Sequence, residues 1–251
     1  MKKIKIINHL INPITILGLL KLIIKWKTNK NTSHYICVSS VHSCMESYFN
    51  KDFKRVNNSA DLAIADGRPI YWALKLLGNK KSQHLPGYYV TDEICKIAVK
   101  QKLKIGFYGS TKKVIKKLSI NLQKKHNGIN IAFKHSPPFS KFYNRKESKI
   151  LKLINKKDID ILFVCLGCPK QELWMYNNKD YLRCTMIGIG AAADYISGNK
   201  KQPNKFFEYL GLAWFIRLIS EPKRLFWRYT STNFLFIILI TMQLLGLKKF
   251  K

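Results

Sequence analysis

Hydrophobic and polar positions follow two different periods along this chain. Six short runs are almost continuously apolar, which is typical of strands buried on both faces of a parallel sheet. These runs are Tyr35–Ser39, Leu62–Ala65, Lys104–Tyr108, Ile129–Phe133, Ile161–Leu166 and Thr185–Ile189. Segments with a helical period separate them, namely His42–Asn50, Pro69–Leu77, Tyr89–Lys100, Thr111–Lys125, Arg145–Asn155 and Pro169–Asn177. The alternation predicts an α/β fold in which helices cover both faces of a parallel sheet.

The N-terminal residues look superficially like a secretory signal peptide, because Lys2 and Lys3 precede an apolar stretch, Ile14–Ile24. Pro13 and Lys21 interrupt the apolar residues, and no cleavage site of small residues follows. We therefore expect a strand and a turn that lead into an amphipathic helix, not a targeting signal.

The pattern changes after Gly198, where no further strand is predicted. The expected elements are a helix at Pro203–Leu210, a turn at Trp214–Ile219, a helix at Pro222–Tyr229 and an apolar run at Phe234–Leu247. We therefore divide the chain into an α/β catalytic core, residues 1–198, and a helical appendage, residues 199–251. As a helix, the apolar run would be about 21 Å long, against about 30 Å for the hydrocarbon core of a bilayer. We expect it to enter one leaflet or to pack on the core, not to span.

The chain is strongly basic, with 45 Lys and Arg against 14 Asp and Glu in 251 residues and a formal charge of +31. This charge predicts an anionic partner, which composition leaves open among nucleic acid, an anionic lipid surface and a phosphorylated substrate. Most of the basic residues are Lys, whereas Arg, which binds phosphate with a planar fork, is scarce. The arginines are Arg55, Arg68, Arg145, Arg183, Arg217, Arg224 and Arg228.

Three of these arginines, Arg217, Arg224 and Arg228, lie within twelve residues, among the aromatic residues of the appendage. Their spacing is close to one helical face, although Pro222 is expected to divide the segment into two helices. Arginines with aromatic neighbours are typical of a surface that binds anionic lipid headgroups or a diphosphate. The alternative is a helix that docks by its apolar side and leaves its arginines solvated. The apolar run that follows favours the first interpretation.

Candidate chemistry lies just after the strands, because ligands of open α/β sheets bind at the carboxyl ends of the strands. Asp66 follows a predicted strand and precedes Gly67, so it is either a general base or a turn and helix-capping residue. The segment from Gly167 to Glu172 is an anion site with Lys170 and Gln171 as polar arms, or an ordinary strand–helix junction.

Other junctions carry weaker signals. Gly109 opens a junction that resembles a capped helix start, while Gly190 and Asp194 belong to a loop of small residues that a ligand could approach closely. Neither G-x-G-x-x-G nor a P-loop occurs, so we expect no dinucleotide cofactor. Asp158 and Asp160 have a D-x-D spacing but precede their strand, so we predict a turn and no metal site there. The six cysteines are expected to be buried, reduced thiols.

The motifs together resemble the WecG/TagA/CpsF family of bacterial glycosyltransferases, from about Tyr35 to Tyr229. The resemblance is carried by six segments, Ile36–His42, Ala60–Gly67, Pro69–Trp72, Asp160–Glu172, Gly188–Asp194 and Arg217–Arg224. It implies a Rossmann-like core with a membrane-facing helical appendage at the C-terminus. It also implies a metal-independent, inverting transfer of a hexose or N-acetylhexosamine from a UDP-sugar to a polyprenyl-diphosphate-linked sugar, in the synthesis of cell-surface polysaccharides.

The resemblance also implies roles for individual residues. It makes Asp66 the general base for the acceptor hydroxyl, places Ser39 and Ser40 at a polar strand end near that base, and matches Gln171 to an active-site glutamine. The three appendage arginines would neutralise diphosphate charge. The chain departs from the family pattern at His84, where an arginine is usual, at Lys201–Pro203 and at Ala213. These departures bear on the donor sugar and the catalytic rate more than on the fold.

We therefore expect a peripheral enzyme on the cytoplasmic face of the bacterial plasma membrane. Its expected partners are a UDP-sugar, a polyprenyl-diphosphate-linked acceptor and an anionic membrane surface, and not nucleic acid. Two alternatives remain, a basic nucleic-acid-binding protein and a family member that has lost catalysis but still binds the membrane. The sequence leaves the oligomeric state open, a homo-oligomer included.

Overall fold

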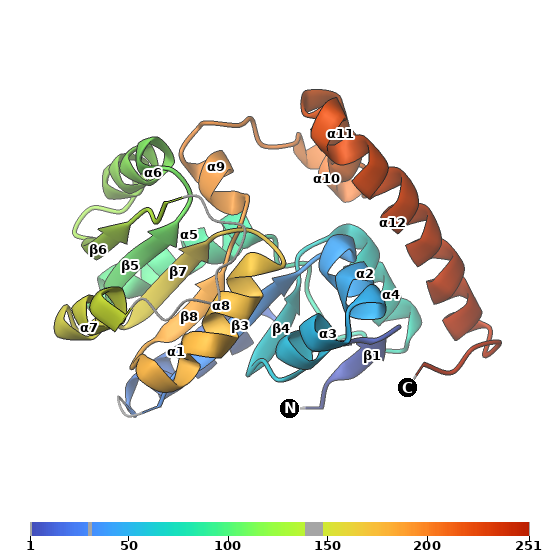
Figure 1. Cartoon of the computed structure of the whole chain (residues 1–251), viewed down its shortest axis with the longest axis horizontal. Helices are drawn as coiled ribbons and strands as arrows, with labels where there is room; N and C mark the ends of the chain where they lie inside the picture. The colour runs from blue at the N-terminus through green and yellow to red at the C-terminus, as the bar shows by residue number, and fades with distance from the viewer. Residues whose placement is uncertain (1, 30–31, 139–147, 251) are drawn as a thin grey trace.

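The computed structural model describes residues 2–29, 32–138 and 148–250, and it leaves the side chains of Arg224 and Arg228 undescribed (Figure 1). Its main sheet has six parallel strands in the order β4-β3-β8-β7-β5-β6. The strands are β3 (His34–Ser39), β4 (Leu62–Ala65), β5 (Lys104–Gly109), β6 (Asn130–His135), β7 (Ile161–Cys165) and β8 (Thr185–Gly188). The predicted parallel α/β sheet is confirmed, and each predicted strand agrees with an observed one within two residues.

Helices cover both faces of this sheet, as the apolar strands require. One face carries α1 (Ile16–Lys27), α5 (Gly87–Lys100), α6 (Lys112–Lys125) and α9 (Ala192–Ile196). The other carries α2 (Val41–Phe49), α4 (Arg68–Leu76), α7 (Ser148–Lys156) and α8 (Lys170–Asn178), with α3 (Lys51–Asn58) beside α2. Successive residues of β3 show the division, since Tyr35 and Cys37 belong to one core and Ile36 to the other.

The N-terminal residues form the strand, turn and amphipathic helix that the sequence predicts. β1 (Ile4–Ile6) pairs with β2 (His9–Ile11) in an antiparallel hairpin that leads into α1. The hydroxyl of Thr15 caps α1 by accepting a hydrogen bond from the Gly18 N–H, and the apolar side of the helix lies in the core. A short 3-10 helix, Lys179–Tyr181, connects α8 to β8.

The C-terminal segment differs from the prediction in two respects. Trp214–Ile219 was expected to be a turn, but it lies inside a helix, α11 (Ala213–Ser220), which follows α10 (Lys205–Tyr209). The expected helix and separate apolar run are one continuous helix, α12 (Pro222–Leu244), which begins at the predicted proline. At 1.5 Å per residue, α12 is about 35 Å long.

This length corrects the argument that the apolar segment is too short to cross a bilayer. By length and composition alone, Leu225–Leu244 could cross one. Part of the helix nevertheless packs on the protein, because Leu225, Tyr229, Phe236 and Leu239 are buried and α12 contacts α2. Figure 1 shows α12, in red, running along the edge of the molecule beside α2 and α4.

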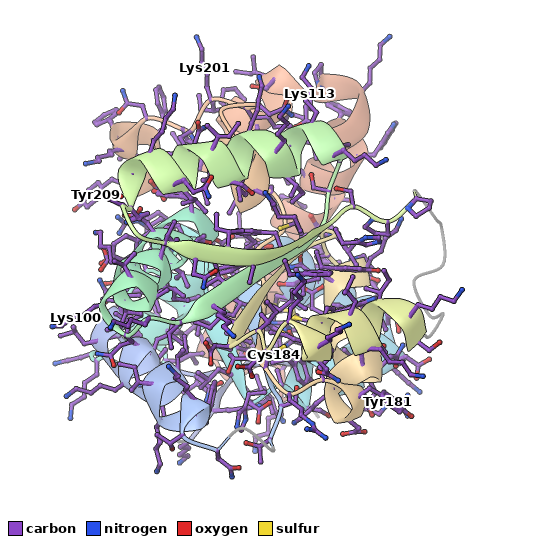
Figure 2. The ribbon with its side chains drawn as sticks, turned by 90° about the vertical axis from the view of Figure 1, so that its left-hand side faces the viewer. Lys100, Lys113, Tyr181, Cys184, Lys201 and Tyr209 are labelled. Carbon is purple, nitrogen blue, oxygen red and sulfur yellow. The ribbon has the colours of Figure 1, made fainter. Side chains whose placement is uncertain are left out.

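The lysine excess lies mainly on the solvated surface. Figure 2 shows Lys100, Lys113 and Lys201 projecting away from the body of the protein, and all three are exposed. Such side chains create a general positive potential, whereas a specific anion site requires cations inside a cavity.

Candidate active site

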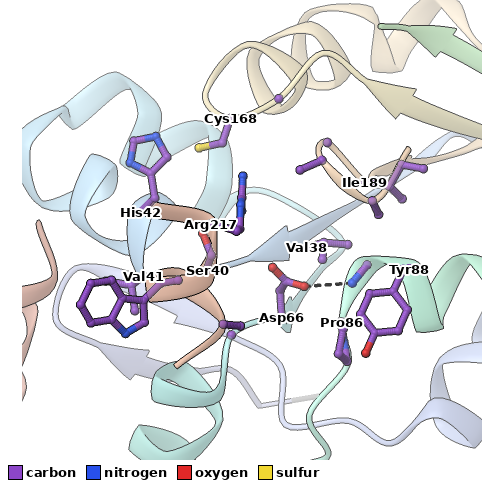
Figure 3. Close-up of a pocket in the computed structure, with 18 of the residues that line it drawn as sticks. Val38, Ser40, Val41, His42, Asp66, Pro86, Tyr88, Cys168, Ile189 and Arg217 are labelled. Atoms are coloured by element: carbon purple, nitrogen blue, oxygen red, sulfur yellow. Dashed lines mark hydrogen bonds between the residues drawn. The ribbon is translucent and has the colours of Figure 1, made fainter. Parts of the chain in front are cut away.

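A cavity of about 580 Å³ opens where the carboxyl ends of five neighbouring strands, β4, β3, β8, β7 and β5, meet the appendage (Figure 3). The strands contribute the residues that follow them, including Ser40, Asp66, Gly167 and Gly190, and the appendage contributes residues of α10, α11 and α12. This is the edge of the sheet at which the sequence predicted the ligand, and the appendage forms the remaining wall.

Two hydrogen bonds, one from the backbone and one to the side chain, hold Asp66 at the cavity. Its N–H donates to the Ser39 carbonyl at 2.9 Å, and its Oδ1 accepts the Gly87 N–H at 2.9 Å (Figure 3). Burial raises the pKa of Asp66 to about 6, although the Gly87 hydrogen bond and the Arg217 guanidinium act in the opposite direction. The carboxylate is therefore ionised at neutral pH while remaining a stronger base than an ordinary aspartate.

His84 lies beside this base but is not a cation. Its ring is hydrogen-bonded to the backbone of Asp66, and burial together with the Arg68 guanidinium lowers the pKa of His84 to about 4. Near neutral pH the imidazole is uncharged, so it cannot supply the positive charge of the arginine that the family resemblance expects here.

Gln171 lies in a tight space between β7 and β8. Its Oε1 accepts the Gly167 N–H at 3.2 Å, and its Nε2 donates to Glu172 Oε1 at 2.9 Å. A Cβ on Gly188 would stand 2.9 Å from Gln171 Nε2, so only glycine leaves room for the amide. Glu172 is fully buried, and this burial raises its pKa to about 7.

Arg217 reaches the cavity from α11, and Figure 3 shows its side chain near Cys168, on the same side of the cavity as Asp66. Burial by itself would lower the pKa of Arg217. The neighbouring Tyr229, Tyr195 and Asp66 act in the opposite direction, so the pKa is raised overall. Its buried Nε has no hydrogen-bond partner within the described structure. The side chains of Arg224 and Arg228 are outside the described part, so their roles stay predictions.

Ten of the predicted site residues line this cavity. They are Ser40, Asp66, Gly67, His84, Gly167, Lys170, Gln171, Gly190, Asp194 and Arg217. Ser39 and Gly109 are not among the lining residues. Ser39 is fully buried under the strand end, and a Cβ on Gly109 would stand 2.7 Å from the Cys165 carbonyl carbon, so this glycine permits close strand packing.

The cavity also contains residues that sequence reasoning did not select. Tyr88 donates to Glu208 Oε2 at 2.6 Å, and Lys200 pairs with Glu221 at 2.6 Å. Arg68, at the start of α4, lines the cavity too. A signal for Arg68 was present, because arginine is rare in this lysine-rich chain and this one directly follows the Asp66–Gly67 motif.

The predicted D-x-D segment lies at the opposite edge of the sheet. Asp160 Oδ2 accepts the Lys104 N–H at 2.8 Å, and Asp158 pairs with the Lys104 ammonium at 3.4 Å. Among residues 2–29, 32–138 and 148–250, no group of three or more His, Cys, Asp or Glu side chains could hold a metal ion. All six cysteines are free, and only Cys168 is not fully buried.

The fold and the cavity define a class of protein, a Rossmann-like α/β protein with a cavity at the carboxyl edge of its sheet, where ligands of such folds bind. The model of the WecG/TagA/CpsF glycosyl transferase family matches residues 4–250. The chain therefore belongs to this glycosyltransferase family, as its motifs predicted.

Two curated relatives carry the name N-acetylglucosaminyldiphosphoundecaprenol N-acetyl-beta-D-mannosaminyltransferase. The protein of Bacillus subtilis (strain 168) is 31% identical over 176 residues, which cover 70% of this chain and 67% of the relative. The protein of Bacillus spizizenii (strain ATCC 23059 / NRRL B-14472 / W23) is 27% identical over 201 residues, which cover 80% of this chain and 76% of the relative.

Proposed function

We propose that this glycosyltransferase moves a hexose or N-acetylhexosamine from a UDP-sugar to a polyprenyl-diphosphate-linked sugar in the synthesis of a cell-surface polymer. The observation that carries the proposal is the Asp66 carboxylate, which lies in the cavity with a pKa of about 6 and beside the Arg217 guanidinium. The names of the two relatives support both the type of sugar and the type of acceptor.

The proposed reaction is a single displacement at the anomeric carbon of the donor. The acceptor hydroxyl attacks this carbon, Asp66 takes the hydroxyl proton, and the bond from the anomeric carbon to the UDP oxygen breaks. UDP leaves with the bonding electron pair, and the configuration at the anomeric carbon inverts. Arg217 is placed to stabilise the negative charge that develops on the departing diphosphate, in place of a divalent metal.

We further propose that the enzyme is peripheral on the cytoplasmic face of the plasma membrane, where a polyprenyl acceptor would be embedded. The support is an exposed apolar surface on the appendage, here called the appendage apolar surface. It consists of Leu212, Phe215, Ile219, Phe226, Trp227, Phe234, Ile237 and Ile238, all exposed. The charge of +31 favours attraction of this surface to anionic lipid.

The central experiment measures UDP release and sugar transfer with a panel of UDP-sugars and a lipid-diphosphate-linked N-acetylglucosamine acceptor. We expect wild type to use at least one UDP-N-acetylhexosamine or UDP-hexose, and Asp66→Asn to lower kcat about 100-fold or more. Asp52→Asn, an exposed carboxylate on α3, is the matched control and should retain full activity.

Three results would contradict parts of the proposal. UDP release that is equal in wild type and Asp66→Asn would remove Asp66 from the chemistry. No transfer and no UDP-sugar binding, together with full membrane association, would instead support a family member that has lost catalysis. Salt-dependent binding of DNA or RNA without vesicle binding would favour the nucleic-acid alternative.

A further inference from the structure

Arg68 is a cavity residue for which the described part of the chain offers no carboxylate partner. It lines the cavity from the first turn of α4, and its buried Nε has no hydrogen-bond partner among the described residues. No salt bridge to it is found among the described residues, although the cavity contains Asp66, Glu208 and Glu221. A half-buried guanidinium with an unused donor and no counter-ion is arranged to receive an anion.

Two aromatic rings fix the position of this guanidinium. Its Cζ lies 5.1 Å from the centroid of the Tyr209 ring and 5.8 Å from that of Tyr71. Tyr71 belongs to α4 of the core, whereas Tyr209 belongs to α10 of the appendage. The rings hold the guanidinium in place without neutralising it, so the hydrogen-bonding edge of its plane stays available for a ligand.

The other basic side chains near Asp66 interact with acidic or tyrosine side chains of the cavity, or are uncharged. Lys200 is paired with Glu221 at 2.6 Å, and Arg217 interacts with Asp66, Glu221 and two tyrosines. His84 is neutral near pH 7 and interacts with Arg68 itself. The part of the cavity around His84 therefore obtains its positive charge from Arg68.

We propose that Arg68 is a substrate-binding residue that holds a diphosphate group of the substrates with its guanidinium fork. This inference rests on the proposed function, in which both the UDP-sugar and the lipid acceptor carry a diphosphate. Tyr209 is the corresponding positioning residue, because its ring supports the guanidinium from the appendage side. One side chain, Arg68, therefore contacts the core through Tyr71, the appendage through Tyr209, and the proposed diphosphate.

The experiment compares Arg68→Gln and Arg68→Lys with wild type and with Lys75→Gln. Lys75 is the matched control, since it also lies on α4, above the same Tyr71 ring at 5.5 Å, but outside the cavity lining. UDP affinity is measured by calorimetry, and KM is measured separately for the donor and for the lipid acceptor. Circular dichroism checks that each variant is folded.

We expect Arg68→Gln to weaken diphosphate binding at least tenfold, and Arg68→Lys to weaken it by a smaller factor, because lysine keeps the charge but loses the fork. Weaker UDP binding with a raised donor KM assigns Arg68 to the donor diphosphate. A raised acceptor KM with unchanged UDP affinity assigns it to the acceptor diphosphate. Arg68→Lys serves as the test if Arg68→Gln does not fold.

The outcomes separate this inference from the proposed function. If wild type binds UDP and transfers sugar, and the Arg68 variants match Lys75→Gln in affinity and in both KM values, only the role of Arg68 is overturned. If wild type neither binds UDP nor transfers sugar, the proposed function fails and the inference fails with it.

The role of Tyr209 has its own test. Tyr209→Leu should raise the same KM that Arg68→Gln raises while leaving kcat within about twofold, and Tyr209→Phe should restore the wild-type value because it keeps the ring. A Tyr209→Leu enzyme with unchanged KM values would overturn the positioning role.

Discussion

At the scale of single residues, the protein environment determines which titratable side chains in and near the cavity are charged at neutral pH. Burial raises the pKa of Asp66 to about 6, lowers that of His84 to about 4 and raises that of Glu172 to about 7. The motif Asp66–Gly67 could be found from the sequence, since it directly follows an apolar strand. Its protonation could not, because burial and the Arg217 charge arise only when residues distant in the chain come together.

The pKa of Asp66 predicts the pH dependence of the reaction. Below about pH 6 the carboxyl is protonated and cannot accept the acceptor proton, so kcat/KM should rise with pH and reach half its plateau near pH 6. In Asp66→Asn the residual rate should lack this rise. The measurement is a pH profile of kcat/KM between pH 5 and 8, and a wild-type profile that is flat through pH 6 would argue against Asp66 as the base.

The raised pKa of the buried Glu172 carboxyl predicts how the stability of the protein depends on pH. Its folded pKa of about 7 exceeds the ordinary value of 4.5, so the folded state binds the proton more tightly and stability falls as pH rises through this interval. Glu172→Gln keeps an oxygen to accept from Gln171 but carries no charge. We expect it to raise the free energy of unfolding by about 1–3 kcal/mol at pH 8 and much less at pH 5.

Urea denaturation at the two pH values measures this difference. Glu93→Gln is the control, because Glu93 pairs with Lys96 at the surface of α5. A gain for Glu172→Gln that is equal at pH 5 and pH 8 would show that the buried charge is not its cause.

At the scale of elements, the strands were predicted well and the appendage poorly, for a physical reason. Strand periodicity is local, whereas the polar residues Thr230–Asn233 hide the continuity of α12 in the sequence. In the structure the hydroxyls of Thr230 and Ser231 donate to the carbonyls of Phe226 and Trp227 at 2.8 and 2.6 Å. Because these polar groups are satisfied within the helix, α12 runs on without a break.

The appendage apolar surface makes a prediction at this scale. Replacing Trp227 and Ile237, which are 78% and 60% exposed, with glutamate should greatly reduce flotation with anionic vesicles, since it adds negative charge to an apolar contact surface. Ile120→Glu, an exposed apolar position on α6, should have little effect. Undiminished flotation of the double variant would exclude this surface as the membrane contact.

At the scale of the whole molecule, the cavity is formed jointly by the α/β core and the C-terminal appendage. Asp66 follows β4 and Gln171 lies on α8 of the core, whereas Arg217 lies on α11, so the appendage completes the cavity as well as carrying the apolar surface. The sequence predicted ten of the residues that line the cavity, most of them near strand ends, but it did not single out Arg68, Tyr88, Lys200 or Glu208. These residues lie on helices or loops, where no local pattern indicates which side chains face a common cavity.

The sequence by itself determined the α/β class, the strands, the edge of the sheet at which the cavity opens, and the family. These features depend on local periodicity and on short motifs, which are present in the chain before it folds. Only the tertiary structure decided the charge states of Asp66, His84 and Glu172, the continuity of α12 and the contact of Arg68 with Tyr209. Desolvation and charge pairing act through space, so they are defined only once residues distant in the sequence pack together.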